Sequence, residues 1–423
     1  MQTHGRLFNI NNENIIAERQ KEKNMKKFIS VILAMAMLAA GVMVFAGCGE
    51  KKATNEIVVG LIGPYTGATA QYGLAVQYGA KLYFDELNES GGINGFKIKA
   101  IAYDSKGEDT EANTAFSRLV EDGMTAFLGE VLTGTTLAIV PDAYEKQIPM
   151  VTASATADAV TVNPDTGVVY NNVFRTCFID SFQGIKMAQY AKEKLNAKTA
   201  AVIYQTGDDY AEGLAKSFKE ECKNIGIEIV GDAGYAKGDV DFKSQLTNFA
   251  SKNPDIVFCP NYYQDDGLIV TQARQVGLTC KFLGGDGWGG VTNYASAADL
   301  EGSVYASAFD ESDPKVKEFK EKYVAKYGAD APFNMFSALA YDAAKVIVNA
   351  ISKSIKLTAS EATKDYFTSN NFKADVISNI KNGSSGIDGL TTKGYSFDEK
   401  NNPIKSITIV ECVNGAEVSK GLY

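Results

Sequence analysis

Residues 56–90, EIVVGLIGPYTGATAQYGLAVQYGAKLYFDELNES, decide the fold. An apolar, β-branched run at 56–63 leads into a turn with Gly and Thr at 64–73, and a helical pattern follows at 74–90. A strand, a short turn and an amphipathic helix in this order form the repeating unit of a parallel α/β sheet. We therefore expect one β–α unit here.

The same unit recurs along the chain. In the first series, further strands are expected at 97–103, 125–129 and 148–153. In a second series, strands are expected at 199–204, 228–235, 255–259 and 281–285, and helices near 183–195, 208–225, 239–252 and 264–277. Two such series predict an α/β fold of two Rossmann-like lobes with parallel central sheets, joined by a multi-strand hinge.

The last third of the chain is expected to cross between the lobes. An apolar run at 303–309 precedes helical patterns at 313–327 and 333–354, and the Gly-, Asn- and Ser-rich end carries a strand-like segment at 405–415 with hairpin punctuation. The expected division is 56–175 plus 307–386 for lobe 1, and 176–306 plus 387–423 for lobe 2. The hinges are expected near Arg175–Cys177, near Ser303–Ala308 and after Gly386.

The N-terminal region has the features of an export signal. Met25 and two lysines precede an uncharged apolar run at 28–47, which ends in small residues directly before Cys48. This arrangement resembles a bacterial lipoprotein signal, with signal peptide 25–47, lipidation at Cys48 and a polar tether at 48–55. A plain membrane anchor is the alternative, because twenty apolar residues could span a bilayer.

Residues 1–24 precede that signal and do not fit export. We expect translation to start at Met25, with 1–24 an untranslated or mis-assigned leader; the mass of the mature protein decides this.

Charge and composition exclude several classes of function. The chain carries 42 basic and 51 acidic residues, and without residues 1–47 the totals are 36 and 48, a net charge of −12. Nucleic acid is therefore not expected as a partner. The single histidine is His4, and the five cysteines beyond Cys48 contain no CxxC pair, so neither a metal nor another cofactor is expected. Most of these cysteines are expected to be buried.

In an open α/β sheet, binding residues follow the carboxyl ends of strands. In the first lobe the turns at 130–136, EVLTGTT, and 152–158, TASATAD, offer hydroxyls and backbone N–H groups but no lysine and no phosphate-binding glycine motif. Such turns suit a carboxylate held at helix N-termini. The alternative is that Thr133 and Thr156 only cap helices.

The strand ends of the second lobe offer aromatic and acidic side chains. Asp286 lies in a glycine-rich loop beside Trp288, the single tryptophan, and could face an ammonium group. Aromatic walls are expected from Tyr72, Tyr210 and Tyr262. Together these features predict a site for an α-amino acid with an apolar side chain.

Over residues 56 to about 345 the sequence resembles the leucine/isoleucine/valine-binding proteins, the substrate-binding lipoproteins of branched-chain amino acid ABC transporters. The segments that carry the resemblance, in the family's order, are VVGLIGPYTGATAQYG, GGINGFKIKAIAYDS, GDDYAEGLAKSFKEECKNIG, DFKSQLTNFASKNPDIVF and QARQVGLTCKFLGGDG. The resemblance implies the type I periplasmic binding protein fold and no enzymatic activity.

It also implies roles for individual residues. The positions matching the family's carboxylate contacts are Thr133, Thr156 and, chiefly through its backbone, Ser154. The positions matching the ammonium partner and its neighbouring aromatic are Asp286 and Tyr210. The positions matching the side-chain pocket are Tyr72, Val131, Tyr262 and Phe336.

The sequence departs from the family at three places. Asp286 stands where a longer glutamate is familiar, and Glu130 stands where a histidine is familiar, which could favour a polar or larger ligand. Leu132 occupies one place of a cysteine pair that this chain lacks. The particular amino acid is therefore left open.

The expected mechanism is binding by closure: the ligand bridges the lobes, and a membrane permease recognises the closed form. The protein is expected to be a monomer outside the cytoplasm, held by lipid on the outer face of the cell membrane. The alternatives are a receptor for amides, urea or aromatic acids, a ligand-sensing domain, and an exported hydrolase. The sequence speaks against a hydrolase, because the mature part contains no histidine and no G-x-S-x-G motif.

Overall fold

The strand β1 (Glu56–Gly63) and the helix α2 (Ala70–Glu89) form where residues 56–90 predict a β–α unit. The structure is a computed structural model that describes Met25 and residues 53–423, and the latter form one compact unit. The predictions for the leader, the signal peptide and Cys48 lie outside the described residues, apart from Met25.

The first sheet is parallel, with the strand order β2-β1-β3-β4-β5. Its remaining strands are β2 (Lys97–Asp104), β3 (Ala126–Leu128), β4 (Met150–Thr152) and β5 (Val173–Arg175). The helices that belong with it are α2, α3 (Asp109–Asp122), α4 (Thr133–Glu145), α11 (Met335–Ser354), α12 (Lys364–Thr368) and α13 (Asn370–Gly383). Because helices cover the sheet, β3, β4 and β5 are buried throughout.

The second sheet has the order β12-β11-β10-β9-β8-β6-β7. Its parallel strands are β6 (Thr199–Gln205), β7 (Glu228–Tyr235), β8 (Ile256–Phe258), β9 (Lys281–Gly284) and β10 (Val304–Ser307). An antiparallel hairpin of β11 (Thr408–Val413) and β12 (Ala416–Leu422) extends the sheet beyond β10. The α-helices of this part are α5 (Asp180–Lys194), α6 (Asp209–Ile225), α7 (Lys243–Lys252), α8 (Tyr263–Gln275) and α9 (Ala297–Leu300).

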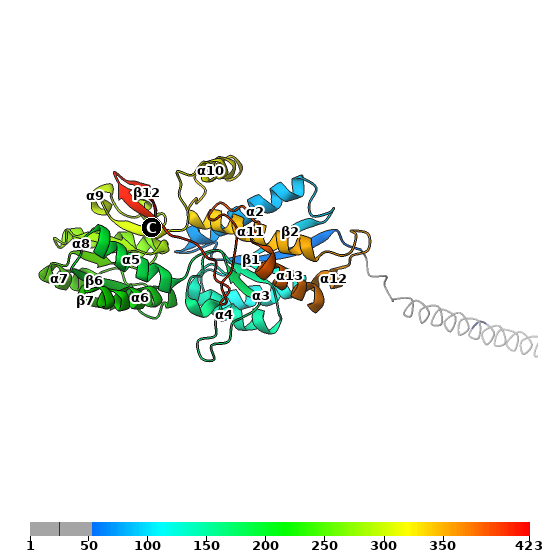
Figure 1. Cartoon of the computed structure of the whole chain (residues 1–423), viewed down its shortest axis with the longest axis horizontal. Helices are drawn as coiled ribbons and strands as arrows, with labels where there is room; N and C mark the ends of the chain where they lie inside the picture. Colours follow the sequence, from blue (N-terminus) through cyan, green and yellow to red (C-terminus); the bar gives the residue numbers. More distant parts are fainter. Residues whose placement is uncertain (1–24, 26–52) are drawn as a thin grey trace, which may run out of the picture. The chain divides into compact units, whose positions relative to one another are not determined.

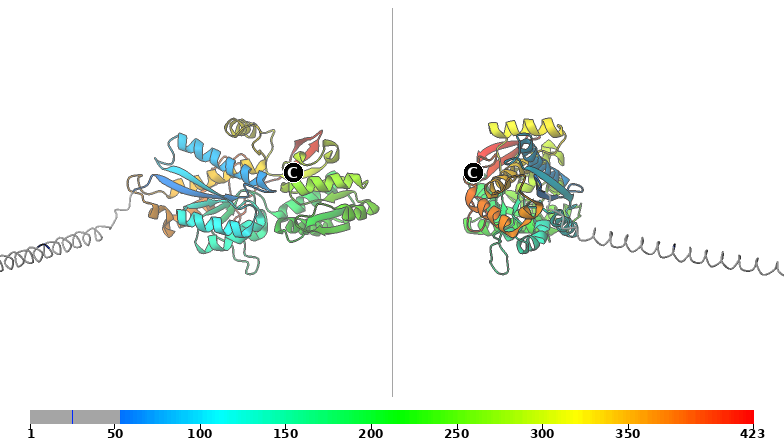
Figure 2. Two further views of the ribbon diagram at one scale, coloured as in Figure 1. Left: turned by 180° about the vertical axis from the view of Figure 1, so that it is seen from behind. Right: turned by 90° about the vertical axis from the view of Figure 1, so that its right-hand side faces the viewer.

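The α/β fold with parallel sheets is confirmed. In Figure 1, α2, α11, β1 and β2 gather in one part of the chain and α5–α8 with β6 and β7 in another, and Figure 2 shows the same two groups from behind. We refer to these groups, each with its sheet, as lobe 1 and lobe 2. α10 (Pro314–Tyr327) contacts α2, and Lys326 pairs with Asp85 of α2 at 2.6 Å.

Three connections join the sheets, at 176–179 after β5, at 308–313 after β10 and at 384–407 before β11. The division at residues 175, 306 and 386 remains a proposal. Contacts of Asn401 with the Tyr170 carbonyl (3.1 Å) and of Asn402 with Thr161 (3.4 Å) place that part of the third connection against lobe 1, and they favour a crossing after residue 402 rather than at 387.

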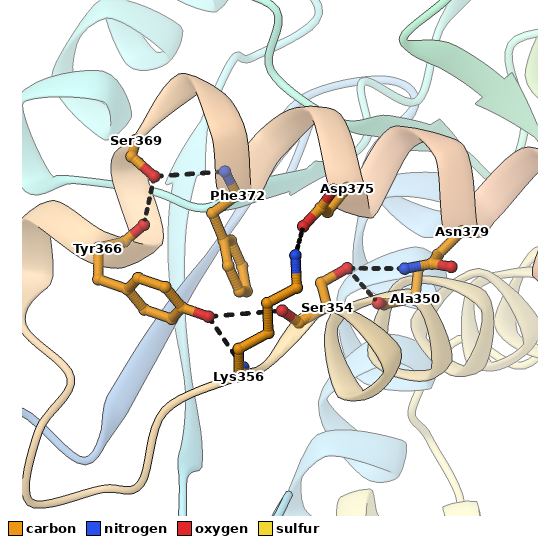
Figure 3. Close-up of polar contacts among 8 residues, drawn as sticks. All are labelled: Ala350, Ser354, Lys356, Tyr366, Ser369, Phe372, Asp375 and Asn379. Carbon is orange, nitrogen blue, oxygen red and sulfur yellow. Dashed lines mark hydrogen bonds and ion pairs between the residues drawn. The ribbon is translucent and has the colours of Figure 1, made fainter.

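Helices α12 and α13 were not expected, because the end of the chain after residue 354 reads as rich in Gly, Asn and Ser, and within 364–383 Asn and Lys interrupt the apolar residues. The α13 residues Phe372, Val376, Ile377 and Ile380 are nevertheless buried at helical spacing. Ser369 caps the helix through the Phe372 N–H (3.3 Å). Figure 3 shows α13 fastened near the end of α11: Asn379 donates to Ser354 (2.9 Å), and Lys356 pairs with Asp375 (2.6 Å).

Three further observations concern the described residues alone. None of their helices combines the length and apolar character needed to cross a bilayer, and none of their His, Cys, Asp and Glu side chains gather in a group fit to hold a metal ion. The five cysteines are free thiols; all except the half-buried Cys280 are buried, as expected for most of them.

Candidate functional site

A narrow cavity lies between the two lobes, with about 270 Å³ of empty space that includes its opening to solvent. Its lining residues follow β1, β3, β4, β6, β8 and β9 or begin α11, and they are Tyr72, Val131, Leu132, Thr133, Ser154, Tyr210, Tyr262, Asp286, Gly287 and Phe336. Eight of the nine predicted ligand contacts are among them. They meet here because the carboxyl ends of the parallel strands converge on the space between the lobes.

Thr156, the ninth, lies one layer behind the cavity wall. Its backbone N–H points toward Thr133 Oγ1, at 3.4 Å, and Thr133 lines the cavity. The Thr156 hydroxyl is buried beside the Asp180 carboxyl. Burial raises the pKa of Asp180 well above its ordinary value, and the contact with Thr156 opposes that shift. Apart from this contact the hydroxyl has no hydrogen-bond partner, so it has capacity for a ligand oxygen.

Neither threonine caps a helix through its side chain, which was the alternative. Leu132 is the residue before α4, and Ala157 the residue before the short helix η1 (Asp158–Val160); neither helix has a side-chain cap. Ser154 is less free: its hydroxyl donates to the Val131 carbonyl at 2.7 Å, and its N–H contacts Thr152 Oγ1 at 3.3 Å. On the lobe 1 side of the cavity, Thr133 and Thr156 therefore have hydroxyls that are freer to bind a ligand than that of Ser154.

On the opposite side, Asp286 begins the short helix η2 (Asp286–Trp288) directly after β9. Its side chain is buried, and Gln183 holds it twice: Gln183 Nε2 donates to Oδ1 (3.2 Å), and Gln183 Oε1 accepts the Asp286 N–H (3.0 Å). Burial raises the pKa of Asp286 to about 6, while hydrogen bonds from Tyr210 and Gln183 oppose the shift. No basic side chain pairs with it among the described residues, so it is suited to a cationic ligand group.

Aromatic rings close the remaining walls of the cavity. Tyr210 and Tyr262 stack with their centroids 5.2 Å apart, and the edge of Tyr72 meets Phe336 at 5.2 Å. These rings provide apolar surface for a side chain, while their hydroxyls are tied to protein groups; the Tyr210 oxygen accepts the Gly287 N–H at 2.8 Å. The cavity thus offers hydroxyls at one end, a carboxylate at the other and apolar walls between.

The two lobes are in direct contact beside the cavity. Tyr72 on α2 donates to the Gly287 carbonyl of lobe 2, and Tyr263 donates to the Ala68 carbonyl of lobe 1 at 2.7 Å. Gln71 adds a bond to the Tyr294 hydroxyl at 2.8 Å. The sequence missed these contacts, because they depend on how the lobes approach each other.

Three other residues of the site were not predicted. Leu132 and Gly287 line the cavity as direct neighbours of predicted positions, so the same strand-end rule could have included them. Gln183, which orients Asp286, lies on α5, and no feature of the sequence marked it.

Glu130 lies next to the cavity, as expected, and its effect on ligand preference stays a prediction. Its carboxylate does not line the cavity; it is fully buried and accepts hydrogen bonds from the Val131 and Leu132 N–H groups (2.6 and 2.8 Å) and from the Ser105 and Thr135 hydroxyls. The carboxylate instead accepts from N–H groups at the start of α4, where the helix dipole stabilises an anion. Burial nevertheless raises the pKa of Glu130 to about 7.

The pKa of Asp286 predicts a pH dependence of binding. Below a pKa of about 6 the carboxyl becomes neutral and no longer attracts an ammonium group, so affinity for an amino acid should be level above pH 7 and fall up to about tenfold per pH unit below 6. Isothermal titration calorimetry from pH 4.5 to 8 measures this. The Asp286→Asn variant should lose this dependence; a wild-type affinity that stays flat to pH 4.5 would contradict the assignment.

Comparisons with known proteins agree with this geometry. A family model described as periplasmic binding protein matches residues 56–417. The leucine-, isoleucine-, valine-, threonine- and alanine-binding protein of Pseudomonas aeruginosa is 30% identical over 323 residues, which are 75% of this chain and 84% of that protein.

Two solved structures are also similar. The branched-chain amino acid transporter substrate-binding protein LivJ from Streptococcus pneumoniae, in complex with isoleucine, is 32% identical with a TM-score of 0.76, over 87% of this chain and 99% of that one. The leucine-binding protein LivK from Thermotoga maritima is 29% identical with a TM-score of 0.75, over 86% and 98%. A family model that spans most of the chain, together with these relatives, establishes that the chain belongs to the periplasmic binding protein family.

Proposed function

We propose that this chain is the extracytoplasmic substrate-binding protein of an ABC importer, and that it binds an amino acid with an apolar side chain in the inter-lobe cavity. The observation that carries the proposal is the chemistry of the two ends of the cavity: the Thr133 hydroxyl, with that of Thr156 behind it, on one side, and on the other the buried Asp286 carboxyl, which has no basic partner among the described residues. A zwitterion supplies a partner for each. The relatives named for branched-chain amino acids support the same ligand class.

In this proposal, Thr133, Thr156 and Ser154 receive the ligand carboxylate and Asp286 the ammonium group. Tyr210, Tyr262, Tyr72, Val131 and Phe336 surround the apolar side chain. Because the ligand touches both lobes, it favours the state in which they are in contact, with rotation about the three connections. A permease then recognises this closed state, and the ligand is transferred without chemical change.

The rest of the proposal concerns the cell. We place the mature protein on the outer face of the cell membrane, as a monomer tethered by lipid at Cys48. Membership of the periplasmic binding protein family supports the extracytoplasmic location.

Replacing Cys48 with alanine should release the protein from the membrane, because the thiol is the acceptor for the lipid. Fractionation of cells that express the full chain should find wild type with the membranes and Cys48→Ala in soluble fractions or as an unprocessed precursor. Intact mass of the purified mature wild type should equal that of a chain starting at residue 48 plus lipid. An unmodified wild-type mass, or equal membrane association of the wild type and a Cys48→Ala form from which residues 25–47 have been removed, would contradict lipidation.

A thermal-shift panel tests the ligand class. Leucine, isoleucine, valine, alanine and glutamate are compared with leucinamide, urea and benzoate, each in large excess. A true ligand at about 1,000 times its dissociation constant stabilises the folded state by about 4 kcal/mol, which gives a clear rise in melting temperature. We expect the largest rise with apolar amino acids. A rise with urea or benzoate alone would favour the alternative receptor and remove the proposed role of Asp286. A rise with leucinamide but not leucine would leave that role in place and remove the proposed carboxylate site.

A further inference from the structure

The strongest feature outside the cavity lining is a buried cation. Arg175, the last residue of β5, is fully buried, and none of the ion pairs of residues 53–423 includes it. Its guanidinium donates instead to two carbonyls, Ala155 O from Nη1 (3.0 Å) and Ala157 O from Nη2 (2.9 Å), and to the Thr161 hydroxyl (3.2 Å). Its Nε is buried without a partner. Burial lowers the pKa of Arg175, and the carboxyls of Asp158, Asp180 and Asp398 are near enough to oppose that shift, but none forms an ion pair with it. A buried cation outside any ion pair is expensive, so it calls for an explanation.

The two carbonyls flank Thr156. Ala155 O belongs to the same peptide unit as the Thr156 N–H, and in a trans peptide the C=O and N–H point in opposite directions. With Arg175 holding the oxygen on one side, the Thr156 N–H is directed away from it, toward Thr133 Oγ1 at 3.4 Å. That is the side on which Thr133 lines the cavity.

A second donor acts on the same oxygen. The thiol of Cys177 lies 3.5 Å from Ala155 O, and burial raises the pKa of Cys177 to about 12, so the sulfur keeps its proton. The peptide is therefore held from behind by a cation and a thiol. Hydrogen bonds in series polarise one another. A cation that donates to the carbonyl oxygen of a peptide therefore makes the N–H of the same peptide a stronger donor.

We propose that Arg175 is a positioning residue that aims and polarises the Ala155–Thr156 peptide, so that the site selects ligands with a free α-carboxylate over those with a neutral amide. The inference rests on the proposed function. It assigns a part in recognising the ligand carboxylate to Arg175, a residue that does not touch the ligand. The positive charge of Arg175, behind the peptide, stabilises a bound ligand carboxylate in front of the peptide and stabilises a neutral amide very little.

The test compares L-leucine with L-leucinamide, which differ at the carboxylate and share the side chain and ammonium group. Calorimetry at pH 7 gives the ratio of the two dissociation constants, amide over acid. In Arg175→Met this ratio should fall about tenfold or more from its wild-type value, because a charge-assisted interaction is lost for the acid alone. Arg175→Lys keeps the charge but not the two-pronged geometry, so it should fall in between.

Lys373→Met is the matched control. Lys373 is also a buried cation that donates to a backbone carbonyl, Lys146 O at 2.7 Å, but that carbonyl follows the end of α4 rather than its cavity end. Its selectivity ratio should stay at the wild-type value. A folded Arg175→Met protein that weakens both ligands equally would overturn the inference, since a merely structural role changes both constants together.

Should Arg175→Met fail to fold, Thr161→Val carries the test, because it removes one anchor of the guanidinium and keeps the charge. The ratio should then fall, by less than in Arg175→Met, because the guanidinium keeps its charge but loses one of the contacts that hold it against the Ala155 carbonyl; an unchanged ratio overturns the inference. Failure of the proposed function is seen separately, in the wild type itself, as no binding of leucine or no preference for it over leucinamide.

Discussion

Replacing Asp286 with alanine is expected to weaken amino acid binding by about 2 to 4 kcal/mol, the range for leaving a buried charged group without its partner. The ligand's ammonium group would then enter a buried space that no longer holds a countercharge, with Gln183 left without one of its acceptors. Calorimetric titration of the wild type and the variant with the best ligand of the panel measures the difference.

Two further variants separate charge from shape. Asp286→Asn keeps the size of the side chain and should lose nearly as much affinity as the alanine variant, because it removes the charge. Asp239→Ala, an exposed loop position outside the cavity, should bind as the wild type does. An Asp286→Ala protein that binds within twofold of the wild type would show that the ammonium group is held elsewhere.

Replacing Trp288 with alanine is expected to destabilise the fold by about 3 to 5 kcal/mol, the range for truncating a fully buried large aromatic side chain. The indole is 0% exposed, and its Nε1 donates to the Cys259 carbonyl at 2.7 Å. It packs so closely under β9 that a Cβ on Gly284 would lie 2.0 Å from it. The indole thereby supports the loop that carries Asp286.

Urea unfolding measures this loss. Because Trp288 is the single tryptophan, the variant has no indole fluorescence, and far-ultraviolet circular dichroism must follow the transition. Trp288→Phe keeps part of the packing and should lose clearly less than the alanine variant. A loss below about 1 kcal/mol for Trp288→Ala would mean that the loop is held by other contacts.

The site was largely predictable because one topological rule places it. Thr133, Tyr210 and Asp286 are far apart in sequence, yet each follows a strand of a parallel sheet, and those ends face the same space. The chemistry of the side chains then indicated which end of a zwitterion each could hold. The fold was predictable for a similar reason, since strands such as β3 and β8 are buried on both faces and read as apolar runs.

What the sequence could not predict depends on the direction of side chains and on non-local packing. Glu130 lies next to a cavity residue, but its carboxylate turns to the start of α4, and only the Val131 and Leu132 N–H groups explain why. Arg175 is fully buried behind the wall, where no periodicity marks it, and Thr156, although predicted as a ligand contact, lies behind Thr133 rather than in the lining. α13 was hidden because its apolar stripe is set among Asn and Lys residues.

The most direct test of the central claim is a crystal structure of the protein with the apolar amino acid that gives the largest thermal shift. The account predicts that the ligand's carboxylate lies within hydrogen-bond distance of Thr133 and Thr156, and its nitrogen beside Asp286, with both lobes in contact with the ligand. A ligand bound with its nitrogen on the threonine side, or held by one lobe alone, would contradict the account.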